Sequence, residues 1–312
     1  MKSAISLQGA LFSGVALTVS LASVALPRLQ PRMELLVLVL LIFFLGVPHG
    51  ALDTVFARQR FHLQTLRSWA IFSAVYVLLG AAVVGLWWQF PAIFLTGFLL
   101  ISAFHFSGDP EKGSSRLLRF WYGGAVLILP ALLHEPEVAA LFGYLVAGDL
   151  SACTASALHW LAGPWLFGLI VTLFFQRRAH WLTSIEVMSA TLLATLAPPL
   201  LSFTVFFCAM HSARHVLRTQ DYAGGMPFTR LVKKSIAPMA ACALVGAAVW
   251  MRIDSVAFEV EIFQILFVAL AALTVPHMAL IESVRMSGGF SAGPRQVPPS
   301  DARAPAALSS DD

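Results

Sequence analysis

Apolar stretches long enough to cross a lipid bilayer follow one another along almost the whole chain, and this feature limits the fold more than any other. A spanning helix needs about 20 mostly apolar residues. Of the 312 residues, 58% are apolar and only 12% are charged, whereas a soluble domain is about 45–50% apolar and about 25% charged. The sequence therefore predicts an all-α, polytopic membrane helix bundle and excludes a pair of soluble domains.

About ten transmembrane helices are predicted. They lie at residues 9–27, 35–57, 68–89, 91–108, 117–134, 155–176, 184–199, 200–219, 234–251 and 260–284. The apolar segment 137–147 is too short to cross and is predicted to be interfacial or re-entrant. From residue 287 onward the chain is rich in Gly, Ser, Pro and Ala, which cannot bury a core. We expect an integral membrane domain over 1–286 and a disordered cytoplasmic tail over 287–312.

The distribution of positive charge supports this count and predicts the orientation. Ten spans place every Lys and Arg on the side of the N-terminus except Arg28, Arg32 and Arg252. Because positively charged loops stay in the cytoplasm, both termini are expected to be cytoplasmic, in the inner membrane of a bacterium or archaeon. The basic residues form no stripe, so no nucleic-acid partner is expected.

Five of the nine histidines lie inside predicted spans at a common depth. Spans two, four, eight and ten all run towards the cytoplasm, and near that end they carry His49, His105, His211, His215 and His277. Ionisable residues inside spans are costly and usually mark a functional site, and imidazole is the commonest metal ligand. The pattern predicts a metal site where the five histidines converge. The other four, His62, His134, His159 and His180, lie in predicted loops or at the outer end of a span and are given no role.

Short-range spacing adds detail to this prediction. His211 and His215 are four residues apart, which lets one helix face present both to one ion. Asp53 and Asp109 each follow a histidine by four residues, so that each carboxylate could accept the second ring N–H of a ligand. Alternatively, both acids face the cytoplasmic headgroups. A proline precedes both His49 and His277, which predicts kinks that turn these histidines inward. Alternatively, each histidine is a buried structural residue whose ring forms a hydrogen bond with a main-chain carbonyl or a serine.

These motifs together resemble one known family. GVPHGALD, the FHF-containing end of the fourth span, HSARH and the late VPHM are similar to the Brp/Blh (bacteriorhodopsin-related-protein-like) family of β-carotene 15,15′-dioxygenases, over about Val47 to Glu282. The resemblance implies a non-haem Fe(2+) held by four ligands, with no catalytic residue beyond the metal ligands. The implied ligands are His49, His105, His211 and His215. The implied candidates for a fifth ligand or an outer partner are His277, Asp53 and Asp109.

The resemblance also implies a reaction. A member of this family is expected to cleave β-carotene with O₂ at its central 15,15′ double bond into two retinals. An iron held by imidazoles keeps open positions at which O₂ can be activated. The implied partners are β-carotene, O₂, the lipid bilayer and a rhodopsin that receives the retinal.

Other classes of function stay open at this point. A membrane metal-dependent hydrolase would be expected to carry a glutamate base beside the histidines, and the residues between His211 and His215 include no acid. A di-iron desaturase or hydroxylase would need more ligands than these. A metal transporter would place its site near the midplane. A non-catalytic carotenoid- or retinal-handling protein would form no product.

Overall fold

The structure is a computed structural model that describes residues 2–28, 30–111, 113–176, 181–252 and 258–287. These residues form helices and no β-strand, which confirms the predicted all-α class. The helices are α1 (Lys2–Ala25), α2 (Pro31–Leu41), η1 (Ile42–Gly46), α3 (Pro48–Ala51), α4 (Asp53–Phe61), α5 (Leu66–Gln89), α6 (Pro91–Phe106), α7 (Arg116–Ile128), α8 (Pro130–Gly143), α9 (Leu150–Gln176), α10 (Trp181–Leu196), α11 (Pro199–Val205), η2 (Phe206–Ser212), α12 (Ala213–Tyr222), α13 (Phe228–Trp250) and α14 (Phe258–Met286).

The described helices agree with a multi-pass membrane protein. Seven continuous helical segments are long and apolar enough to cross a membrane, and α7 with α8, bent by 44°, is an eighth candidate. The two remaining predicted spans correspond to the shorter apolar helices α6 and α10. Every predicted span therefore coincides with a helix, while the number of ten crossings stays a prediction.

Three predicted segments have other bounds in the structure or lie beyond it. The span predicted over 117–134 is divided at Leu129, where α7 ends and α8 begins at Pro130. In the segment 137–147, which we expected to be interfacial or re-entrant, residues 137–143 form the second half of α8, and its place relative to the membrane stays a prediction. The tail predicted over 287–312 lies outside the described residues apart from Ser287.

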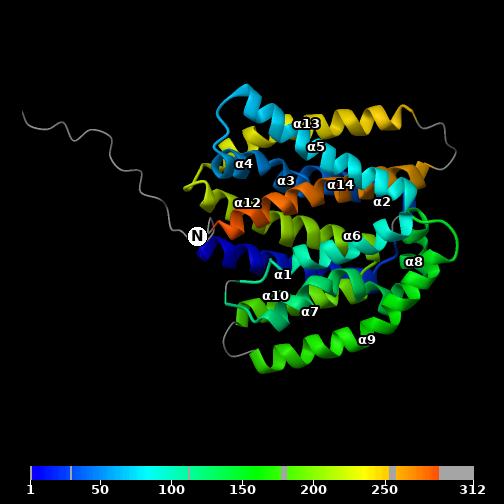
Figure 1. Cartoon of the computed structure of the whole chain (residues 1–312). Coiled ribbons are helices and arrows are strands. Elements are labelled where there is room, and N and C mark those ends of the chain that lie inside the picture. Colours follow the sequence, from blue (N-terminus) through cyan, green and yellow to red (C-terminus); the bar gives the residue numbers. More distant parts are fainter. Residues whose placement is uncertain (1, 29, 112, 177–180, 253–257, 288–312) are drawn as a thin grey trace, which may run out of the picture.

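The histidine-bearing helices lie in the middle of the bundle (Figure 1). Helices α5 and α13 lie at one edge, and α5 has no buried residue. Helix α9 lies at the opposite edge, where it packs on α7 and α8. The start of α1 and the end of α14 lie at the same end of the bundle, as an even number of crossings requires. The main hydrophobic core joins α1, α6, α7, α9, α10 and α14.

Two π-helical segments interrupt the helices that carry the histidines. In η1, the amide of Val47 donates to the carbonyl of Ile42 at 2.8 Å, and Pro48, which has no N–H, then begins α3. The regular α-helix is therefore interrupted directly before His49, where a kink was predicted. Helix α14 continues through Pro276, and the kink there stays a prediction. The second π-helix, η2, contains His211. π-Helical segments are rare in proteins, and those that occur often lie at functional sites.

Candidate metal centre

The five histidines of the spans converge on one point of the bundle, as their common depth predicted. They come from α3, α6, η2, α12 and α14. The ring of His49 is central, with its centroid 5.0–6.5 Å from those of the other four. Those four form a circuit around it, with centroid distances of 4.4 Å (His105–His211), 6.4 Å (His211–His215), 5.0 Å (His215–His277) and 5.2 Å (His277–His105).

These distances fit rings that share one ion. An imidazole nitrogen binds a metal at about 2 Å and the ring centre lies about 1 Å further out, so two rings on one ion have centres at most roughly 6.5 Å apart. The ligand atoms of His49, His105 and His277 all lie within 4.8 Å of one another. The most compact group thus includes His277, which the resemblance left between ligand and outer partner, and omits His211 and His215.

Two buried carboxylates orient two of the rings. The Nδ1–H of His277 donates to Asp53 at 2.7 Å, and the Tyr76 hydroxyl donates to the other carboxylate oxygen at 2.8 Å. The Nδ1–H of His211 donates to both carboxylate oxygens of Asp109, each at 3.0 Å. An ionised carboxylate only accepts hydrogen bonds, so each Nδ1 carries a proton and Nε2 is the nitrogen left to bind a metal.

Uncharged acceptors fix two further rings in the same way. The Nδ1–H of His49 donates to the carbonyl of Gly46 at 2.6 Å. The Thr219 hydroxyl donates to the carbonyl of His215 at 2.8 Å, so its oxygen accepts from the Nδ1–H of the same histidine at 3.3 Å. In four of the five rings Nδ1 is therefore engaged in a hydrogen bond, and Nε2 is the nitrogen that would bind a metal. Metal-binding histidines are arranged in this way.

The Nε2 atoms of His211 and His277 are buried and have no hydrogen-bond partner. Buried polar atoms nearly always have a partner. A metal ion would supply the missing partner of both Nε2 atoms. The charges agree, because Asp53 and Asp109 are each only 4% exposed. Neither carboxylate forms an ion pair with Arg or Lys among the described residues. Because Arg218 lies beside Asp109, Asp53 is the acid whose buried charge a divalent cation would balance, and the donor set fits a metal ion.

The two acids lie beside different histidines from those that the spacing suggested. We expected Asp53 to face His49 and Asp109 to face His105, yet Asp53 binds His277 and Asp109 binds His211. The helix ends at Ala51 and restarts at Asp53, and α6 ends at Phe106, before Asp109. An i, i+4 pair meets only along an unbroken helix. The alternative that both acids face headgroups is wrong as well, because both are buried.

Aromatic rings enclose the histidines. Phe207 stacks on His211 with an interplanar angle of 15°, Phe106 meets the same ring edge-on, and Phe56 contacts His215. Residue 46 must be glycine here, because a Cβ would overlap the Phe207 ring. Aromatic rings therefore form part of the wall of the cluster.

Other residues near the motifs take no part. The thiol of Cys208 donates to the carbonyl of Leu41, and Glu282 pairs with Arg285 at the surface. His62 is exposed, and His180 lies outside the described residues. His134 differs from its expected place in a loop, because it lies within α8 with a side chain only 14% exposed.

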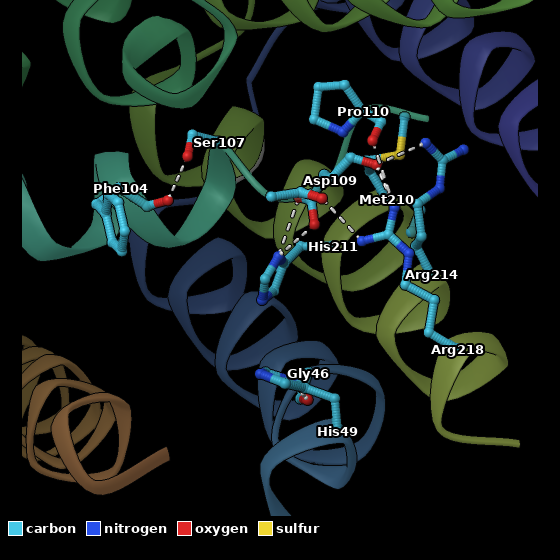
Figure 2. A network of polar contacts seen from close by, with 12 residues as sticks. Gly46, His49, Phe104, Ser107, Asp109, Pro110, Met210, His211, Arg214 and Arg218 are labelled. Carbon is cyan, nitrogen blue, oxygen red and sulfur yellow. Dashed lines mark hydrogen bonds and ion pairs between the residues drawn. The ribbon is translucent and has the colours of Figure 1, made fainter. Parts of the chain in front are cut away.

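Several residues at the site were not singled out from the sequence. Figure 2 shows Arg214 and Arg218 reaching the segment that carries Asp109, and Arg214 is bound by Glu186. These charges lie inside predicted spans, which is itself a signal of function. Ser212 of the HSARH motif donates to the carbonyls of Leu45 and Gly46 at 2.6 and 3.0 Å and so ties η2 to η1.

Comparison with known proteins agrees with this geometry. The family model described as beta-carotene 15,15'-dioxygenase matches residues 40–285, a region that contains all five histidines. The chain belongs to this family. A family relative named beta-carotene 15,15'-dioxygenase, from an uncultured marine bacterium, is 31% identical over 78% of this chain and 91% of its own. Another, named probable beta-carotene 15,15'-dioxygenase Blh, from Halobacterium salinarum, is 27% identical over 76% of this chain and 80% of its own. No solved structure matches the chain.

Proposed function

We propose that this protein is a membrane β-carotene 15,15′-dioxygenase that uses a non-haem Fe(2+) and O₂. The observation that carries the proposal is the cluster of five histidines, three of them buried, in which two Nε2 atoms have no partner and the matching Nδ1 atoms face carboxylates. Membership of the family and the names of its relatives support the activity.

The ligands of the proposed iron are drawn from His49, His105, His211, His215 and His277. When bound, the iron supplies a site at which O₂ is activated. The carboxylates of Asp53 and Asp109 accept the Nδ1–H of two of these rings and so leave Nε2 of each ring to bind the metal. All the ligands are neutral, which suits a site at membrane depth, where a charged group is costly.

An apolar groove beside the cluster supports a long hydrocarbon substrate. It has a volume of about 410 Å³ and lies between α5 and α14, with Phe72, Val75, Leu79, Pro276 and Leu280 in its wall. Along α5 it runs from Ser68 to Leu79, about 16 Å at the helical rise. An elongated apolar molecule can lie along it from the bilayer.

The groove is linked to the cluster by hydrogen bonds. Tyr76 lies in its wall, and the hydroxyl of this tyrosine donates to Asp53, which in turn accepts from His277. A substrate in the groove would therefore lie beside a residue that orients a candidate ligand. Positioning of this kind accounts for much of the rate in enzymes that act on an otherwise unreactive bond.

The proposed reaction balances without an external electron donor. One C=C bond and one O₂ become two C=O groups, so both oxygen atoms enter the two retinal molecules. Aromatic rings contact His211 and His215 and give the proposed site an apolar surrounding that suits a hydrocarbon. We place the protein in the cell membrane, where substrate and product both dissolve, and a rhodopsin is the proposed acceptor of retinal.

The carboxylates argue against a metal-dependent hydrolase. Such an enzyme needs a free carboxylate to activate water. The acids at the cluster are instead engaged, Asp53 and Asp109 by histidines and Glu186 by Arg214.

The test is expression in bacteria that accumulate β-carotene, with extraction of retinoids and metal analysis of the purified protein. The unaltered protein should form retinal and contain iron. His49→Ala or His211→Ala should remove both, and His62→Ala is the matched control because this histidine is exposed. Retinal formation at the full rate by protein without iron would refute the metal centre, and iron-loaded protein that forms no retinal would refute the activity.

A further inference from the structure

We infer that Glu186 and the arginines Arg214 and Arg218 are positioning residues that hold Asp109 in place for His211. This inference rests on the metal centre proposed above and assigns a purpose to three charged side chains inside predicted spans that no sequence motif explained. Among the residues that the structure describes, none of the three forms a hydrogen bond or ion pair with a histidine of the cluster, so they act through Asp109.

The Glu186–Arg214 pair is deeply buried. The two carboxylate oxygens of Glu186 accept from both terminal nitrogens of Arg214 at 2.9 and 2.7 Å, and the arginine side chain is only 1% exposed. The Nε–H of Arg214 donates to Gln8 at 2.9 Å. This two-point contact fixes the plane of the guanidinium. The pair also needs Gly9, because a Cβ there would overlap a carboxylate oxygen of Glu186.

The arginines hold the main chain around Asp109. Its carbonyl oxygen accepts from Nη1 of Arg214 at 3.3 Å and from Nη2 of Arg218 at 2.7 Å. Arg218 also binds the carbonyl of Gly108 at 2.8 Å, and Arg119 binds that of Pro110 at 3.1 Å. Figure 2 shows Arg214 and Arg218 on one side of Asp109 and the His211 ring on the other. The carboxylate is thereby left to His211.

This clamp is needed because Asp109 has no helix to hold it. Helix α6 ends at Phe106 and α7 begins at Arg116, so the segment between them is positioned by side chains from elsewhere. Carbonyl oxygens of a loop are good acceptors for arginine, whose planar fork presents five N–H groups.

Glu186 has a second effect, which is to occupy Arg214. A guanidinium pairs strongly with any nearby carboxylate, and Nη1 of Arg214 already lies 3.3 Å from the Asp109 main chain. Without Glu186, Arg214 could turn to the Asp109 carboxylate and compete with His211 for it. The pair therefore keeps Asp109, the only carboxylate that binds His211 among the described residues, available to that ring.

The experiment measures metal binding by the purified full-length protein in detergent after iron is replaced with Co²⁺. The ligand-field absorption bands of Co²⁺ report the geometry of its ligands, and a competing chelator gives the affinity. Glu186→Gln should shift the bands and weaken Co²⁺ binding about tenfold, at the lower end of the roughly 10–100-fold effect of removing a direct partner of a ligand. Glu186→Asp should restore part of the affinity.

Matched variants separate positioning from general stability. Glu261→Gln alters another buried acid. Glu261 lies in the first turn of α14, far along the helix from His277, so this variant should leave the bands unchanged. Because Glu186→Gln leaves a buried arginine unpaired and could fail to fold, Arg218→Gln provides a second variant that breaks no ion pair. Its control is Arg60→Gln, since Arg60 also donates to a main-chain carbonyl, that of Ser283.

The outcomes are distinct. Shifted bands with weaker binding in Glu186→Gln or Arg218→Gln, and in neither control, support the inference. Unchanged bands and affinity in folded Arg218→Gln and folded Glu186→Gln overturn it while the metal centre stands. No cobalt bands in the unaltered protein would refute the metal centre and the inference with it.

Discussion

The substitution Asp53→Asn tests the metal centre at one hydrogen bond. Asp53 is 4% exposed and accepts from the Nδ1–H of His277 and from the hydroxyl of Tyr76. Asparagine has nearly the same shape but no charge, and one end of its amide donates. If its oxygen keeps the bond to His277, its NH₂ must face Tyr76, whose hydroxyl can then turn to the carbonyl of Leu273, 3.5 Å away.

The expected loss follows from these contacts. A hydrogen bond to a charged group contributes about 1.5–3 kcal/mol and a neutral one about 0.5–1.5 kcal/mol. The difference of about 1–1.5 kcal/mol corresponds to roughly tenfold in affinity. We therefore expect Asp53→Asn to fold and to bind metal about tenfold more weakly, within the range of about 10–100-fold known for such partners. Tyr76→Phe leaves the His277 bond intact and should weaken binding less.

The assay is titration of the metal-free protein with Fe²⁺ against a chelator under anaerobic conditions, together with retinal yield and thermal unfolding. Asp221→Asn is the control, because Asp221 is exposed at the end of α12 and its removal should change stability by about 0–1 kcal/mol. Affinity within twofold of the unaltered protein for folded Asp53→Asn would refute the orienting role. An unaltered protein whose unfolding temperature does not rise with Fe²⁺ would indicate that the Asp53–His277 pair is only a buried polar contact.

Three further predictions concern topology, substrate and metal. Reporter fusions after Arg285 should lie in the cytoplasm and fusions after Arg252 outside, and a cytoplasmic signal at Arg252 would break the count of ten spans. Val75→Trp should fill part of the groove and reduce retinal yield without loss of iron, whereas Val77→Trp, on the exposed face of α5, should change neither; equal yields would remove the groove from the substrate path. Removal of metal by a chelator should lower the unfolding temperature and Fe²⁺ should restore it, because a ligand at 100 times its Kd stabilises by about 2.7 kcal/mol; an unfolding curve that the chelator leaves in place would contradict this.

The sequence alone was enough for the class of fold and for the depth of the candidate site. Long apolar stretches leave the backbone no alternative to helices in a bilayer, and the rise per residue then fixes how deep each histidine lies. This is why the meeting of His49, His105, His211, His215 and His277 could be predicted without any coordinates.

The tertiary structure decided which residues are neighbours across helices. The depth of a residue along a helix does not determine how the helix is rotated or which helix packs beside it. Because the helix is broken at Leu52, Asp53 forms its hydrogen bond with His277 rather than with His49. Asp109 follows the end of α6, so its direction depends on arginines from α12 that no local spacing connects to it. Contacts between residues far apart in the chain are set by packing, and only the folded bundle brings Glu186 to Arg214.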